Sequence, residues 1–160
     1  MTRPAPAERI IRARQPGTDF EHSISFFITV LANRKTIAVG RILQRELGLS
    51  VTEWRILALL AVEPGSRPAR LIEVAAVDKS SVSRGVARLQ RRGLIAVEPD
   101  AANRRRLHLF LTEAGLELHH KGLRLSFAGD EALLAGMNLV ERRVLIDGIR
   151  RLIENVAKLE

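Results

Sequence analysis

Residues 78–93 constrain the fold of this chain more than any other segment, because a narrow helical stripe of apolar residues runs through them. Val82, Val86 and Leu89 are spaced i, i+4 and i+7, which places them on one face of a helix. The other positions carry hydroxyl groups, an amide and cations, without a single acid: Lys79, Ser80, Ser81, Ser83, Arg84, Arg88, Gln90 and Arg91. This pattern favours a helix that lies against a polyanion, since an ordinary solvated helix mixes both signs of charge.

The ends of this helix are also visible in the sequence. Asp78 is suited to accept hydrogen bonds from the unpaired amides of the first turn, and Gly93 to the left-handed residue that follows a helix. The chain has a net charge of +8, and eight bases against two acids between Lys79 and Arg106 supply +6 of it. Because the charge is concentrated and lacks the broad apolar face of a membrane-surface helix, we expect nucleic acid as the partner.

Composition excludes several other classes. The chain contains no cysteine, which removes disulfides, thiolate nucleophiles and cysteine-bound zinc, and fits a cytoplasmic location. Neither a membrane-spanning run nor a secretory signal is recognisable. The histidines lack ligand spacing, and His119 and His120 are adjacent, so we expect no metal and no other cofactor. No nucleophile with a base and no phosphate loop is present, which argues against an enzyme.

Apolar periodicity predicts a mostly α-helical chain. We expect a flexible basic arm over residues 1–17, then a long helix from about residue 19 to 47 and a central apolar helix from a capping box at Ser50 and Glu53 to about residue 62. Further helices are predicted from Pro68 to residue 76, over 79–92, from the cap Thr112 to about 134, and from the cap Asn138 onward.

After Gly93 the apolar period changes from 3.6 to 2, which predicts strands over 94–98 and 107–111 joined by an arginine-rich turn. Two helices joined by a short turn and followed by such a hairpin form a winged helix-turn-helix, here over residues 49–111. Its second helix fits the major groove of double-stranded DNA, and the hairpin, or wing, reaches the minor groove.

Position along these elements predicts the role of each side chain. We expect five residues near the start of the second helix to face base edges, with Arg84 as a bidentate ligand of guanine: Lys79, Ser80, Ser81, Ser83 and Arg84. Arg88 and Arg91, farther along the helix, are expected at phosphates. Three wing residues are predicted in the minor groove: Arg104, Arg105 and Arg106. Alternatively, Ser80 only caps the helix and the wing arginines are solvated.

Five segments of the chain resemble the MarR family of transcriptional regulators: LSVTEWRIL at 49–57, VDKSSVSR at 77–84, RLQRRGL at 88–94, NRR at 103–105 and LTEAG at 111–115. The resemblance extends over roughly residues 20–158. It implies a homodimer whose two wings straddle a pseudopalindromic operator, and it implies an Asp-x-Arg signature in the wing. Arg105 matches the arginine of that signature, whereas Asn103 stands at the acidic position. Asp100 is close enough in sequence to compensate.

The resemblance also gives the terminal segments, 18–48 and 112–160, a role in dimerisation. Both carry apolar faces that are too extensive to be left in water, made of Phe20, Ile24 and Phe27 and of Leu145, Ile149, Leu152 and Val156, the latter at heptad spacing. The alternative is that these faces pack within one protomer.

Many members of that family bind small aromatic or amphipathic compounds between the dimer helices and the winged region. By that resemblance we expect candidates for such a pocket at His22, Phe26, Arg34, Trp54 and Arg55. Each also has a plain interpretation, as a core aromatic or a solvated side chain. The sequence thus predicts a sequence-specific regulator of transcription, most simply a repressor released by a ligand. The alternative is an architectural DNA-binding protein of low specificity that senses nothing.

Overall fold

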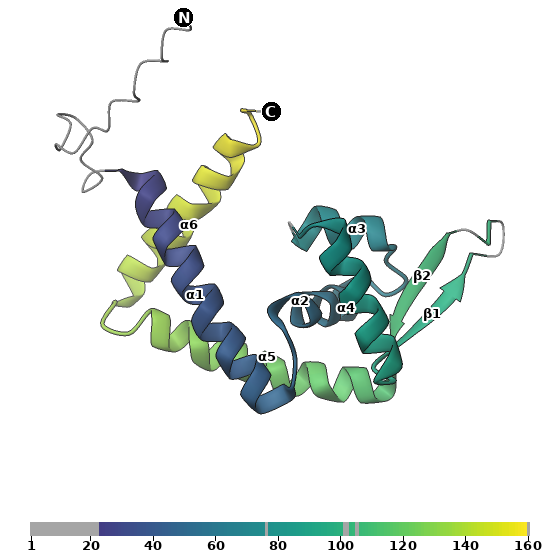
Figure 1. The fold of residues 1–160 in the computed structure, drawn as a ribbon. Helices are drawn as coiled ribbons and strands as arrows, with labels where there is room; N and C mark the ends of the chain where they lie inside the picture. Colours follow the sequence, from purple (N-terminus) through teal and green to yellow (C-terminus); the bar gives the residue numbers. More distant parts are fainter. Residues whose placement is uncertain (1–22, 76, 101–102, 105, 160) are drawn as a thin grey trace, which may run out of the picture. The chain divides into compact units, whose positions relative to one another are not determined.

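A computed structural model describes residues 23–159 apart from 76, 101, 102 and 105, and these residues form six helices and one antiparallel hairpin (Figure 1). The helices are α1 (Ile24–Leu47), α2 (Val51–Val62), α3 (Pro68–Ala75), α4 (Lys79–Arg91), α5 (Glu113–Leu133) and α6 (Leu139–Val156). The strands are β1 (Ile95–Pro99) and β2 (Leu107–Leu111). The mostly α-helical class with a small hairpin is confirmed. The fold divides into two compact units, residues 1–37 and residues 38–160.

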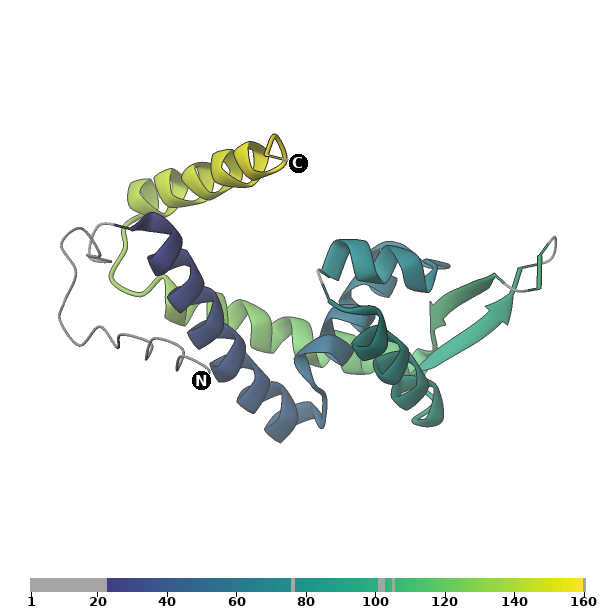
Figure 2. The same ribbon diagram turned by 45° about the horizontal axis from the view of Figure 1, so that its top comes forward.

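A single apolar core lies in the larger unit, and α2 is central to it. Helix α2 contacts α3, α4, α5 and β2, as its nearly continuous apolar sequence predicts. Figure 2 shows α2, α3 and α4 gathered where the hairpin begins, with the strands extending away from them. The core consists of Leu43, Leu47, Leu49, Ile56, Leu57, Leu60, Leu71, Val82, Leu89, Leu94, Ile95 and Leu109.

The predicted helix caps are confirmed. The Ser50 and Asn138 side chains each accept from the amide of an acid three residues on, and that acid reaches back to the cap amide, so both capping boxes are complete. Thr112 Oγ1 accepts the Gly115 N–H, and Asp78 accepts the Ser81 N–H. These caps satisfy amides that would otherwise lack partners at the first turn of each helix.

The hairpin differs from the predicted one by one residue. Strand β1 covers Ile95–Pro99 rather than 94–98, and it pairs with β2 so that Ile95 faces Leu111 and Pro99 faces Leu107. Leu94 instead closes the preceding helix, since its N–H donates to Leu89 O at 3.0 Å and its side chain is buried. Ser66 extends the hairpin on its other side through an antiparallel bridge to Leu109.

Helix α1 begins later than the predicted residue 19. Ser23 is not helical, and its hydroxyl accepts the Phe26 N–H at 3.3 Å, so that it caps a helix starting at Ile24. The predicted arm at residues 1–17 lies outside the described residues. At the other end, Gly48 has a positive φ of 63° and ends the helix as predicted.

Helix α6 has no buried residue. Its heptad-spaced residues are substantially exposed, with Leu145 at 40%, Ile149 at 44%, Leu152 at 39% and Val156 at 58%. Although the helix is apolar on one face, none of the described helices has the length and hydropathy that a membrane crossing requires.

Candidate nucleic-acid interface

Helix α4 presents the acid-free face that its sequence predicts. Val82, Gly85 and Leu89 are buried against α2, whereas Lys79, Ser83 and Arg91 are exposed. A Cβ at Gly85 would lie 2.8 Å from Ile56 Cδ1, so a glycine allows α4 to lie this close to α2. The close packing holds α4 in place and leaves its polar face turned to solvent.

Arg84 is oriented by its neighbours rather than loose in solvent. Its Nη1 donates to Ser80 Oγ at 3.1 Å and its Nη2 donates to Ser81 Oγ at 3.0 Å. Ser80 Oγ in turn donates to Asp78 Oδ1, which also accepts the Ser81 N–H at 2.9 Å. The structure therefore brings together three of the five predicted base-reading residues, and the two serines act on Arg84.

The carboxylate that anchors this arrangement stays ionised. Hydrogen bonds from Ser80 first and then Ser81 hold the pKa of Asp78 well below its usual range, with a smaller contribution from the charge of Arg84. Because the carboxylate remains charged, the hydroxyl of Ser80 continues to donate to it and presents its lone pairs to Arg84. The cap of α4 and the orientation of Arg84 are thus one hydrogen-bonded chain.

Arg88 has a partner that sequence analysis missed. Its Nε lies 3.1 Å from Glu53 Oε1, and the Glu53 side chain is only 1% exposed. The other carboxylate oxygen accepts the Ser50 N–H at 2.7 Å. Among the described residues, Oε1 has no well-formed hydrogen bond, so Arg88 neutralises it chiefly through its charge. Arg88 therefore compensates a buried acid, while 55% of its own side chain stays exposed.

The first turn of α2 and the face of α4 enclose a shallow hollow of about 170 Å³. Thr52 contributes from α2, and Ser81, Arg84 and Arg88 contribute from α4. Two guanidinium groups beside hydroxyls suit an anion, although the hollow also contains Glu53. Its position places it on the same surface as the predicted base-reading residues.

Arg92 links α4 to the end of α1. Its Nη1 donates to Gly48 O at 2.8 Å and its Nη2 donates to Leu47 O at 3.2 Å. These carbonyls lack helical partners at the end of α1, and the positive charge of Arg92 also interacts favourably with the negative end of the helix dipole. In the sequence, Arg92 contributed only to the net charge, because its partners lie more than forty residues away.

The turn of the wing is held by Asp100. Its Oδ1 accepts the Asn103 N–H at 2.9 Å, and its backbone N–H donates to Arg106 O at 2.9 Å. The Arg106 N–H donates to Asn103 O at 2.7 Å. Arg104 and Arg106 are exposed, and Arg105 lies outside the described residues. Asp100 thus gives the turn an acidic anchor, although Asn103 occupies the acidic position of the signature.

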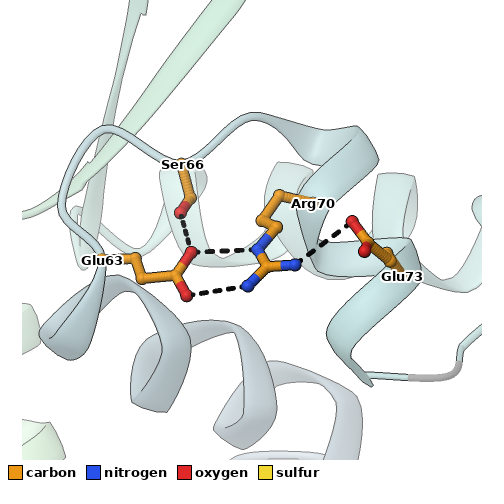
Figure 3. A network of polar contacts seen from close by, with 4 residues as sticks. All are labelled: Glu63, Ser66, Arg70 and Glu73. Carbon is orange, nitrogen blue, oxygen red and sulfur yellow. Dashed lines mark hydrogen bonds and ion pairs between the residues drawn. The ribbon is translucent and has the colours of Figure 1, made fainter.

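A polar cluster that sequence analysis did not single out fixes the loop between α2 and α3 (Figure 3). Arg70 donates through Nε and Nη2 to both carboxylate oxygens of Glu63, at 3.1 and 3.0 Å, and its Nη1 lies 3.2 Å from Glu73. Ser66 also donates to Glu63. The hydrogen bonds from Arg70 lower the pKa of Glu63, so this carboxylate remains charged.

Of the predicted pocket residues, Trp54 and Arg55 lie in the unit of residues 38–160. Trp54 stacks on His119, with ring centroids 5.5 Å apart and planes 15° apart, and a Cβ at Gly122 would lie 2.2 Å from the indole. Arg55 is exposed beside it. Phe26 and Arg34 belong to the separately described unit that ends at residue 37, where both are exposed. His22 and the dimerisation candidate Phe20 lie outside the described residues.

The stacked His119 is a further residue without a predicted role. Burial lowers its pKa, with a smaller effect from the neighbouring His120, so its ring is held neutral. Its Nδ1 is buried and has no hydrogen-bond partner among the described residues. The stack favours the interpretation of Trp54 as a packing residue.

Helices α3 and α4, joined by a short turn and followed by a hairpin that carries exposed arginines, define the winged helix-turn-helix class of DNA-binding proteins. The sequence pattern described as MarR family matches residues 47–106, which include α2, α3, α4 and β1. Over residues 47–106 the chain therefore has the sequence pattern of the MarR family of transcriptional regulators, whose members bind DNA.

Individual relatives agree with this assignment. The transcriptional regulator HosA of Escherichia coli O157:H7 is 28% identical over 104 residues, which are 65% of this chain and 77% of HosA. The HTH-type transcriptional repressor NicR of Pseudomonas putida is 30% identical over 90 residues, covering 56% of this chain and 57% of NicR. A Listeria monocytogenes protein described as a MarR family regulator, solved in complex with a 26-mer DNA, superposes with a TM-score of 0.76 at 25% identity, covering 84% of this chain and 89% of that one.

Proposed function

We propose that the protein is a homodimeric repressor that binds a pseudopalindromic operator and leaves it when a small aromatic or amphipathic organic ligand binds. The observation that carries the proposal is the oriented guanidinium of Arg84 on an exposed helix face without acids. Two relatives support it: NicR is named a repressor, and the Listeria monocytogenes protein was solved in complex with a 26-mer DNA. In this proposal residues 49–111 bind DNA, residues 18–48 and 112–160 dimerise, and the protein acts in the cytoplasm.

Base readout is proposed for the first turns of α4. Lys79, Ser83 and Arg84 would face base edges in the major groove, with Ser80 and Ser81 aiming Arg84 at a guanine. Arg91, and the exposed part of Arg88, would contact phosphates. The wing arginines 104–106 would enter the minor groove, where the electrostatic potential is most negative.

A selection with random duplex DNA at physiological salt tests this function. We expect one inverted repeat whose half-sites are separated by about one helical turn, roughly 34 Å, because each protomer places one α4 in the major groove. Recovery of no motif, with binding that falls uniformly as the salt concentration rises, would contradict a sequence-specific regulator and favour the architectural alternative.

Replacing Arg84 with alanine is expected to weaken binding to the selected repeat by about 1–3 kcal/mol and to relax the preference at one base pair. Arg84→Lys should restore charge but not the preference, because an ammonium group cannot make the bidentate contact. Binding to every single-base variant of the repeat gives the measurement, with Arg91→Ala as the control for uniform loss. If Arg84→Ala lost affinity equally for all sequences, Arg84 would be a phosphate ligand only.

The exposed apolar face of α6 is the basis for the proposed dimer. Sedimentation equilibrium should give twice the chain mass of 17.8 kDa. Leu152→Glu should shift the protein towards monomer, because a carboxylate would enter the heptad seam, while Arg151→Glu one position away should not. A wild-type protein of single-chain mass at micromolar concentration would rule out the dimer.

The same face does not identify an effector. We base the ligand proposal on the resemblance to the MarR family, whose members often bind small organic compounds between the dimer helices and the winged region. Release of the selected duplex, screened against small aromatic acids, tests it. Failure of the whole library to change duplex affinity would favour the architectural alternative over a sensor.

A further inference from the structure

His108 in β2 connects two separate parts of the winged region through its ring. Its Nδ1 lies 2.8 Å from Gly65 O in the α2–α3 loop. Its Nε2 lies 2.9 Å from Asp100 Oδ2 in the wing turn. The ring is one third exposed, so it lies between the loop and the turn rather than in the core.

Both groups that face the ring are acceptors. A carbonyl oxygen and an ionised carboxylate oxygen have no hydrogen to give, so each contact requires the histidine nitrogen to donate. A neutral imidazole carries one N–H, and its second nitrogen would point a lone pair at an oxygen. Only the doubly protonated imidazolium donates to Gly65 O and Asp100 Oδ2 together.

Each end of this bridge is itself fixed. On the wing side, the other oxygen of Asp100 accepts the Asn103 N–H, which sets the turn that carries Arg104 and Arg106. On the loop side, Gly65 N–H donates to Leu109 O at 2.9 Å. The same loop is held to α3 through Glu63 and Arg70 (Figure 3).

We propose that His108 is a positioning residue of the wing, whose protonated ring ties the arginine-bearing turn to the loop before α3 and so couples DNA affinity to pH. The coupling to DNA rests on the proposed minor-groove role of the wing. The bridge between Gly65, His108 and Asp100 is independent of that role, because all of its contacts lie within the protein. This arrangement also explains how Asn103 is tolerated at the acidic position: the anchoring carboxylate is Asp100, and its counter-charge is His108.

The charged groups around the ring set the direction of the pH dependence. Asp100 raises the pKa of His108 above its ordinary value of 6.5, first through the hydrogen bond and further through its charge, and the Gly65 carbonyl adds to this. Arg67, just before α3, lowers the pKa, as does burial. Glu98 lies directly opposite His108 in the hairpin register.

The raised pKa of His108 determines how the bridge responds to pH. Because the folded-state pKa lies above 6.5, the bridge is fully present below pH 6.5 and is lost as the pH rises through the raised pKa. Duplex affinity should therefore fall in the same range.

The bridge is tested first without DNA. Nuclear magnetic resonance of the full-length protein follows the histidine ring protons and the Asn103 and Arg106 amides against pH. We expect a His108 pKa above 6.5, with amide exchange at Asn103 rising as the ring loses its proton. In Asp100→Asn the pKa should fall towards or below 6.5, since the carboxylate is gone. A wild-type His108 that titrates at or below 6.5 would overturn the proposal.

The second test uses the duplex recovered by selection. His108→Gln and Asp100→Asn should bind with a flatter pH profile than wild type, whereas His120→Gln, which removes an exposed histidine of α5, should keep the wild-type profile. Thermal unfolding checks that the variants fold. Arg105→Ala, at the arginine that matches the family signature, separates the two proposals: unchanged affinity there would refute the role of the wing in DNA binding. Weakened affinity there, with His108→Gln as pH-dependent as wild type, would refute the positioning role of His108.

Discussion

Gly115→Ala is expected to destabilise the protein by about 3 kcal/mol or more, at the upper end of what overpacking usually costs. A Cβ at this position would lie 1.9 Å from the backbone oxygen of Leu94. That oxygen cannot move away, because it accepts the Thr112 N–H at 3.1 Å at the start of α5. Relief of the clash would therefore break the junction between the hairpin and α5.

Urea denaturation measures this effect, and α5 offers a matched control. Gly129 lies in the same helix, and a Cβ there would meet nothing within 4 Å. Gly129→Ala should raise stability by about 0.5–1 kcal/mol, because alanine loses less backbone entropy in a helix than glycine does. Equal free energies of unfolding for the two variants would mean that the close approach of α5 to Leu94 is wrong.

Arg88→Met is expected to cost about 3 kcal/mol of stability, the lower end of the cost of removing one partner from a buried ion pair. The methionine keeps the apolar stem of the side chain but leaves the carboxylate of Glu53 buried without its cation. Glu53→Gln in the same protein should recover most of the loss, since the amide oxygen still accepts the Ser50 N–H and the buried charge is gone.

Arg91→Met is the control, because Arg91 is exposed on the same helix and has a similar place in the proposed DNA interface. Its stability should stay within about 0.5 kcal/mol of wild type. Should Arg88→Met be as stable as Arg91→Met in urea, the pair with Glu53 contributes nothing and Arg88 serves DNA alone. A large loss of stability in Arg88→Met would mean that part of any loss of DNA binding by this variant comes from unfolded protein.

The elements that sequence analysis predicted well are those whose signals are local. The caps at Ser50, Asp78, Thr112 and Asn138 depend on residues two or three positions apart, and the structure confirms all four. Periodicity likewise placed α4 to within one residue. The second strand, 107–111, was predicted correctly, whereas the first was displaced by one residue, because an alternating apolar pattern does not show that Leu94 completes the helix before the strand begins.

The sequence predicted which residues of α4 are exposed, but it did not predict the hydrogen bonds and ion pairs that these residues make. The exposed residues of α4 were recognised, and Ser80 and Ser81 were expected to read bases, but their hydrogen bonds from Arg84 were not predicted. Glu53 was recognised only as a capping residue, since nothing in the sequence shows that its carboxylate is buried beneath Arg88. His108 and Gly65 are forty-three positions apart, so their contact depends on the fold.

The junction of α4, the hairpin and α5 has a mechanical consequence. Thr112 Oγ1 donates to Gly93 O at 2.6 Å, and Gly115 packs on Leu94, so the start of α5 is held to the residues that directly follow α4. Helix α5 has 21 residues, and at about 1.5 Å per residue it is a lever roughly 30 Å long. If the far end is tilted by about 10°, the other end is displaced by about 5 Å. In the proposed DNA complex, a small angular change at the far end of α5 would therefore be enough to misalign α4 with the major groove.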